Sequence, residues 1–98
     1  MFLHLGGDVV IPVRDIIAIM DMGAMMKSKD DKEFLKNAEK EGLIYKIYGD
    51  EPKSCVLAER ASCRKKDLNR SNQRIIYYSP ISSTTLQKRA GFMDEMHI

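Results

Sequence analysis

The residues best suited to chemistry in this 98-residue chain are basic, and they gather in one segment. From Arg60 to Arg74 six basic residues stand against one acid, so this stretch carries +5 while the rest of the chain carries −3. The basic residues are Arg60, Arg64, Lys65, Lys66, Arg70 and Arg74. Clustered Lys and Arg neutralise phosphates, so the segment suits a polyanion such as a nucleic-acid backbone. A solvated insertion whose charge prevents strand edges from pairing is the equally weighted alternative.

Arg14 is a second candidate, because it follows a bend at Pro12 within an apolar run. A guanidinium held by a rigid element can make forked contacts with phosphate or with a guanine edge. The competing interpretation is an ion pair with an acid such as Asp15 or with a neighbouring subunit. Lys53, in a later turn, either extends the same surface or is an ordinary solvated lysine.

No pattern in the sequence indicates a catalytic or metal site. There is no glycine-rich phosphate loop before a helix, no His-Glu metal helix and no nucleophile elbow. Cys55 and Cys63 are too few for a disulfide framework and match no common zinc spacing, and His4 and His97 stand near the chain ends. We therefore predict a protein that is not an enzyme and that uses no cofactor or metal.

Length and composition indicate one α+β domain over residues 1–98, with a basic insertion loop at about 59–73. The charged share of 31% and ordinary hydrophobic share argue against disorder. No apolar run approaches the roughly 20 residues that a membrane span needs. We expect a cytoplasmic protein with a small antiparallel sheet of about four strands and two helices.

Four apolar or β-branched runs supply the strands of this sheet. Met1–Leu5 and Val9–Met20 form a hairpin around a glycine turn, with Pro12 marking an edge position or a bend in the second strand. Ser54–Ala58 and Arg74–Ser79 flank the basic segment. Leu43–Tyr48 is either a further strand or an extended connection.

Two helices follow from capping signals. Ser28 is the expected N-cap of the first, Phe34, Leu35 and Ala38 form its apolar stripe, and Gly42 ends it. The hydroxyl cluster at residues 82–85, with Thr84 and Gln87 at capping-box spacing, begins a last helix that we expect to run through about Met96. Four methionines between residues 20 and 26 form either buried core or a subunit interface.

Three stretches of the chain resemble a known family. The opening MFLHLGGDVVIPVRDIIAIMD, the turn segment EPKS and the closing YYSPISSTTLQKRA are similar to the RemB branch of the RemA/RemB extracellular matrix regulators. The resemblance implies a DNA-binding regulator of biofilm matrix genes that assembles into ring-shaped oligomers. The resemblance also places Arg14 at a basic position that members of this family use to contact DNA. The turn at residues 48–53 is arginine-rich in such proteins, whereas here Asp50 and Glu51 take two of those places and Lys53 alone keeps a positive charge.

Together these observations predict a DNA-associated transcriptional regulator that acts as an oligomer. Its partners are double-stranded DNA, contacted through the backbone, and further copies of itself, with no small-molecule substrate and no membrane. The predicted contact residues are Arg14, Lys53, Arg60, Arg64, Lys65, Lys66 and Arg70. The alternative is an oligomeric scaffold that modulates a regulator without touching DNA, which the acidic residues in the 48–53 turn favour.

Overall fold

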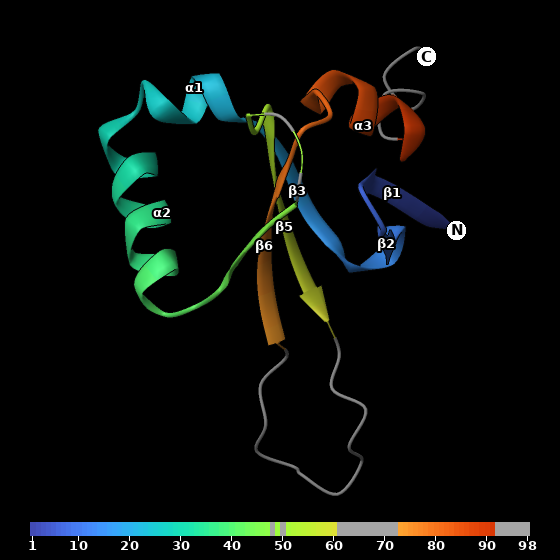
Figure 1. Ribbon diagram of the computed structural model, residues 1–98, viewed down its shortest axis with the longest axis horizontal. Coiled ribbons are helices and arrows are strands. Elements are labelled where there is room, and N and C mark those ends of the chain that lie inside the picture. The colour runs from blue at the N-terminus through green and yellow to red at the C-terminus, as the bar shows by residue number, and fades with distance from the viewer. Residues whose placement is uncertain (48, 50, 61–72, 92–98) are drawn as a thin grey trace, which may run out of the picture.

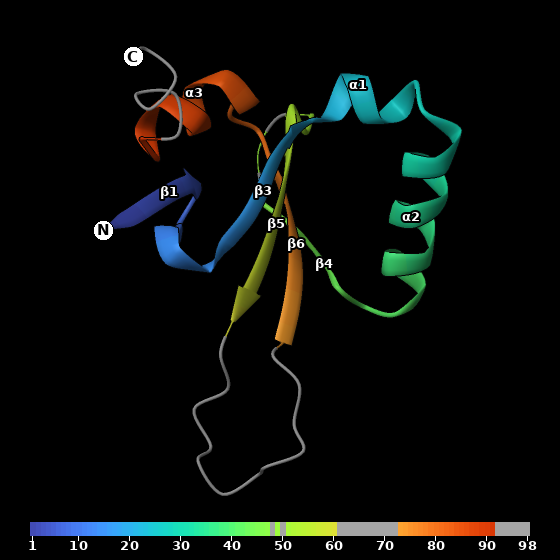
Figure 2. The ribbon, with the colours of Figure 1, turned by 180° about the vertical axis from the view of Figure 1, so that it is seen from behind.

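The computed structural model describes residues 1–47, 49, 51–60 and 73–91, which form three layers (Figures 1 and 2). A four-stranded sheet is the middle layer, a two-stranded hairpin and one helix cover one face, and two helices cover the other. In chain order the elements are β1 (Phe2–Gly6), β2 (Val9–Pro12), the 3-10 turn η1 (Val13–Asp15), β3 (Ile16–Asp21), α1 (Met22–Met26), α2 (Lys29–Lys40), β4 (Ile44–Lys46), β5 (Ser54–Arg60), β6 (Gln73–Ser79) and α3 (Ser83–Arg89). The predicted α+β class is confirmed.

The strand order in the central sheet is β3-β5-β6-β4. β5 pairs antiparallel with both β3 and β6, in line with the predicted antiparallel sheet, but β4 pairs parallel with β6, so the sheet is mixed. The connection from β3 through α1 and α2 explains this difference. A helical crossover returns the chain to the end of the sheet where it began, so the strand that follows must run parallel to the first.

The apolar run Val9–Met20 is divided between the two sheets. β2 pairs with β1 in the hairpin and β3 pairs with β5 in the central sheet, and η1 turns the chain between them. Pro12 lies at the break, where its missing N–H costs no ladder hydrogen bond. The expected bend is therefore a complete change of sheet.

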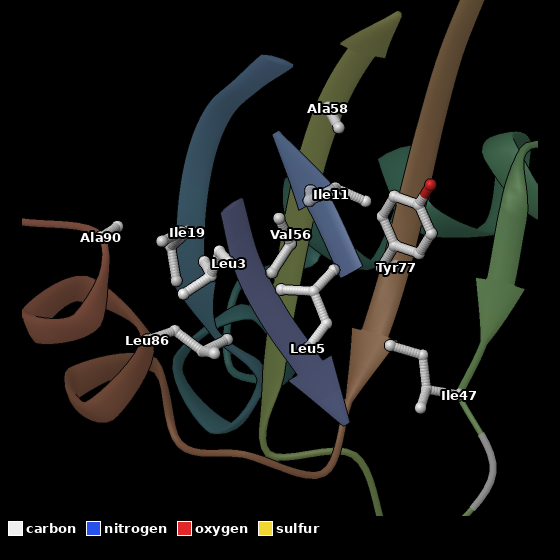
Figure 3. Close-up of a cluster of buried hydrophobic side chains, with 10 residues drawn as sticks. All are labelled: Leu3, Leu5, Ile11, Ile19, Ile47, Val56, Ala58, Tyr77, Leu86 and Ala90. Carbon is white, nitrogen blue, oxygen red and sulfur yellow. The ribbon is translucent and has the colours of Figure 1, made fainter. Parts of the chain in front are cut away.

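The main core lies between the central sheet and the layer formed by the hairpin and α3 (Figure 3). Its members are Leu3, Leu5, Ile11, Ile19, Ile47, Val56, Ala58, Tyr77, Leu86 and Ala90. The hydroxyl of Ser79 in β6 donates to the carbonyl oxygen of Leu5 and so also ties the hairpin to the sheet. A second cluster on the opposite face contains Met22, Met25, Leu35, Ala38, Cys55 and Ile76.

The first long helix begins where its cap predicts. The Ser28 hydroxyl accepts a hydrogen bond from the Asp31 amide at 3.3 Å, and Gly42 follows the helix with a φ of +73°. Leu35 and Ala38 are buried, whereas Phe34 at the margin of the stripe is 46% exposed. α1 was not expected from the sequence, and it buries Met22 and Met25, which favours the core interpretation for these two methionines.

The last helix begins within the predicted hydroxyl cluster and differs from the expectation at its other end. Of the candidate caps at residues 82–85, Ser82 is the N-cap and accepts from the Thr85 amide at 3.3 Å. The helix ends at Arg89 instead of about Met96, because Gly91 has a φ of +83° that α-helical geometry excludes.

Candidate nucleic-acid interface

Arg14 is the central residue of η1, the short turn that carries the chain from the hairpin to the central sheet. The turn is fixed at both ends: the Val13 amide donates to the carbonyl of Met1 at 3.0 Å, and the Ile16 amide donates to the carbonyl of Val13. The Arg14 side chain is exposed. The sequence expectation of a guanidinium held by a rigid element is thus matched by its position.

A shallow pocket of about 460 Å³ adjoins Arg14 and is otherwise apolar. It is lined by Met1, Phe2, Pro12, Val13 and Arg14. Phe2 lies opposite Pro12 in the hairpin register and remains 68% exposed, and Met1 is 78% exposed. A cation beside an exposed aromatic ring can hold an anionic group while the ring contacts an apolar surface.

Arg14 forms no salt bridge with any residue that the structure describes. Within that part of the chain the two salt bridges join Lys46 to Glu39 at 3.9 Å and Arg74 to Glu59 at 4.0 Å. The alternative sequence interpretation, an ion pair between Arg14 and Asp15, is therefore not realised inside one chain. Among the described residues, none neutralises the charge of Arg14 through a salt bridge.

Arg60 lies at the same end of the sheet as Arg14, because Ile16 is paired with Ala58 and η1 contacts β5. Side chains alternate along a strand, so Arg60 faces the hairpin layer as the buried Ala58 does. Arg74 is paired with Glu59 and faces the α2 layer instead. Arg64, Lys65, Lys66 and Arg70 lie outside the described residues, within the segment 61–72 that joins Arg60 to Gln73.

Lys53 lies at the opposite end of the sheet from Arg14. It precedes Ser54, which pairs with Asp21 at the far end of β3. Its backbone is fixed, with its amide donating to Ser79 at 2.8 Å and its carbonyl accepting from Met22 at 3.0 Å, while its side chain is exposed. The length of β3 separates it from Arg14 by roughly 15–20 Å. One chain therefore does not bring Lys53 and Arg14 together.

The groups that could do other chemistry are occupied or buried. His4 Nε2 lies 2.7 Å from the carbonyl oxygen of Gly7. Cys55 is fully buried, and burial, with a smaller effect of the Asp31 charge, raises the pKa of its thiol to about 11. The described part of the chain holds no cluster of three or more His, Cys, Asp or Glu suited to a metal ion. Nor does it contain a helix with the length and apolarity to cross a membrane.

Phe2 is the residue beside Arg14 that the sequence analysis missed. The signal was present, because Leu3 and Leu5 alternate with Phe2 and His4 in a strand with one buried face. A large aromatic residue on the outward face of such a strand is what reveals an uncovered apolar surface.

Comparison with known proteins places these features in a family. A family model described as RemA-like, extracellular matrix regulatory protein A-like, matches residues 2–90. Extracellular matrix regulatory protein B of Bacillus subtilis (strain 168) is 41% identical over 96 residues, which cover 98% of this chain and 98% of that protein. The chain belongs to the RemA-like family of extracellular matrix regulatory proteins.

Proposed function

We propose that this protein is a cytoplasmic regulator of extracellular matrix genes that binds DNA as an oligomer through the cationic surface around Arg14. The name of the Bacillus subtilis relative supports the regulatory role. The observation that carries the DNA contact is Arg14 itself, exposed on a fixed turn without an acidic partner among the described residues. Arg60 adds charge on the same side of the sheet end.

Such a surface contacts phosphates more than it identifies bases. Two or three cations per chain give weak binding that falls steeply with salt. Several copies held side by side act at a high effective concentration and convert weak contacts into firm binding. Lys53 lies too far from Arg14 to add to this surface within one chain. A continuous cationic surface that includes both residues would have to combine Arg14 of one copy with Lys53 of the next.

The apolar surface beside Arg14 supports self-association. Phe2, Met1 and Val10 on the hairpin are more than half exposed, at 68%, 78% and 53%. Ile17, 51% exposed, lies at the bulge in the edge strand β3. Adjacent exposed apolar residues of this kind are typical of protein interfaces. The same observation favours the second candidate function, an oligomeric scaffold that never touches DNA.

A salt titration of DNA binding tests the proposal. We expect Arg14→Ala to weaken binding of a labelled duplex at every salt concentration. It should also reduce the slope of log affinity against log salt by about one for each chain of the oligomer that contacts the duplex. Arg89→Ala, which removes an equal charge from an exposed position on α3, is the matched control and should bind as wild type. Equal binding by wild type and both variants would show that Arg14 does not contact DNA. A stable oligomer whose mass no duplex shifts would favour the scaffold.

A further inference from the structure

A row of four lysines runs along the outer surface of α2. Lys29, Lys32, Lys36 and Lys40 are spaced by three, four and four residues, which places them within an arc of about 80° at 100° per residue. All four side chains are exposed, and together with Glu33 and Asn37 they line a shallow depression of about 380 Å³. We call these four residues the α2 lysine face.

The depression holds four lysines and one acid, although the charge of α2 sums to zero. Four lysines are matched by Asp30, Asp31, Glu33 and Glu39, but only Glu33 shares the depression with the lysines. Glu39 pairs with Lys46, and Asp31 is partly buried on the side of Cys55, whose pKa its charge raises. None of the four lysines forms a salt bridge with a described residue.

The lysines of this face repel one another along the helix. Lys32 with Lys36, and Lys36 with Lys40, are like charges one turn apart, which destabilise a helix. Glu33, three or four residues from Lys29 and Lys36, offsets part of this repulsion. An anion bound along the α2 lysine face would relieve the repulsion that remains.

The α2 lysine face lies on the opposite flank of the molecule from Arg14. α2 forms the outer layer on one side of the sheet, and the hairpin that leads into η1 lies on the other side (Figures 1 and 2). The two cationic surfaces therefore cannot contact the same short stretch of a straight duplex from one chain.

We propose that the α2 lysine face is a second binding surface for nucleic-acid phosphates, independent of Arg14. Lys29 to Lys40 spans about 16 Å along the helix axis, comparable to the axial rise of about five base pairs at 3.4 Å each. Lysine ammonium groups contact phosphates as point charges and read no sequence. With cations on two opposite flanks, one chain holds two duplex segments, or two parts of a bent duplex, together.

The test compares two double variants with the same loss of charge. Lys36→Gln/Lys40→Gln removes half of the α2 lysine face, and glutamine keeps the helix propensity of lysine. Lys88→Gln/Arg89→Gln on α3 is the matched control, because both residues are exposed and lie on the other layer. Thermal melting of each variant should show that the fold is retained.

In a salt titration with a labelled duplex we expect the α2 variant to lose about two from the slope of log affinity against log salt, while the control keeps the wild-type slope. Arg14→Ala should leave the α2 contribution in place, so the two surfaces are distinguished. An α2 variant that binds duplex as wild type does at every salt concentration overturns the inference, even where Arg14→Ala weakens binding. Loss of binding to phosphatidylserine vesicles with unchanged duplex binding also overturns it and indicates a membrane surface instead.

Discussion

At the scale of single residues, position decides which of the many charged side chains can act. Arg14 and Arg74 have the same chemistry, but Arg74 is paired with Glu59 on the α2 side of the sheet, whereas Arg14 stands on a fixed turn and forms no salt bridge with a described acid. Sequence reasoning identified Arg14 because a proline marks its turn. It could not place Lys53 relative to Arg14, since only the strand register sets them at opposite ends of β3.

Cys55 offers a prediction about pH. Its thiol has a raised pKa of about 11 in the folded protein against an ordinary value of 9.0, so the unfolded chain releases the proton first. The folded state is therefore favoured while the thiol is neutral in both states, below about pH 9, and this contribution to the free energy of unfolding is lost as the pH rises toward 11. We expect the free energy of unfolding of wild type to fall more over this range than that of Cys55→Ala, measured by urea denaturation at each pH. Tyr78, whose pKa is also raised by burial, requires Tyr78→Phe as a parallel control. Parallel curves for wild type and Cys55→Ala would contradict the burial of a neutral thiol.

At the scale of elements, local signals identified most of the secondary structure, and tertiary connections decided the rest. The hairpin, β5, β6 and the start of α2 follow from alternation, glycine turns and a serine cap. α1 escaped notice because five residues with a central glycine carry no helical periodicity. The parallel pairing of β4 depends on a crossover that spans the sheet, and no pattern in three residues encodes it.

The hairpin should be held to the sheet chiefly by its inward side chains. Leu5 is fully buried in the main core, whereas Val10 on the outward face is 53% exposed. We expect Leu5→Ala to lower the free energy of unfolding by about 2–5 kcal/mol through loss of burial and an unfilled cavity. Val10→Ala should change it by less than about 0.5 kcal/mol. Chemical denaturation measures both, and similar losses from the two variants would mean that the outward face is buried in a partner.

At the scale of the whole molecule, the three layers separate its surfaces by chemistry. The hairpin flank carries exposed apolar residues beside Arg14, and the α2 flank carries lysines. Net charge could not reveal this, because the four lysines of α2 are cancelled in the sum by four acids of the same helix, three of which lie outside the lysine depression. The helical arrangement of those charges was readable from sequence spacing, but which flank they occupy required the fold.

Self-association should depend on the hairpin flank. We expect Phe2→Ser to reduce the mass of the assembly in sedimentation or light scattering at matched concentration, while melting stays close to wild type because Phe2 is already 68% exposed. Phe34→Ser, at a 46% exposed position on α2, is the corresponding change on the other flank and should leave the mass unaltered. A loss of mass with Phe34→Ser and not with Phe2→Ser would show that the chains associate through α2 instead.

The strand order β3-β5-β6-β4 has a consequence for biosynthesis. The two border strands emerge from the ribosome first, and both central strands come later in the chain. Until residue 79 has been synthesised, the nascent chain lacks a complete β6, and the edge strands β3 and β4 have no complete central pair of strands to bind. The central sheet therefore cannot form before residue 79 has been synthesised, and a message cut short before the codon for residue 79 yields a product with exposed apolar segments that cellular proteases can degrade.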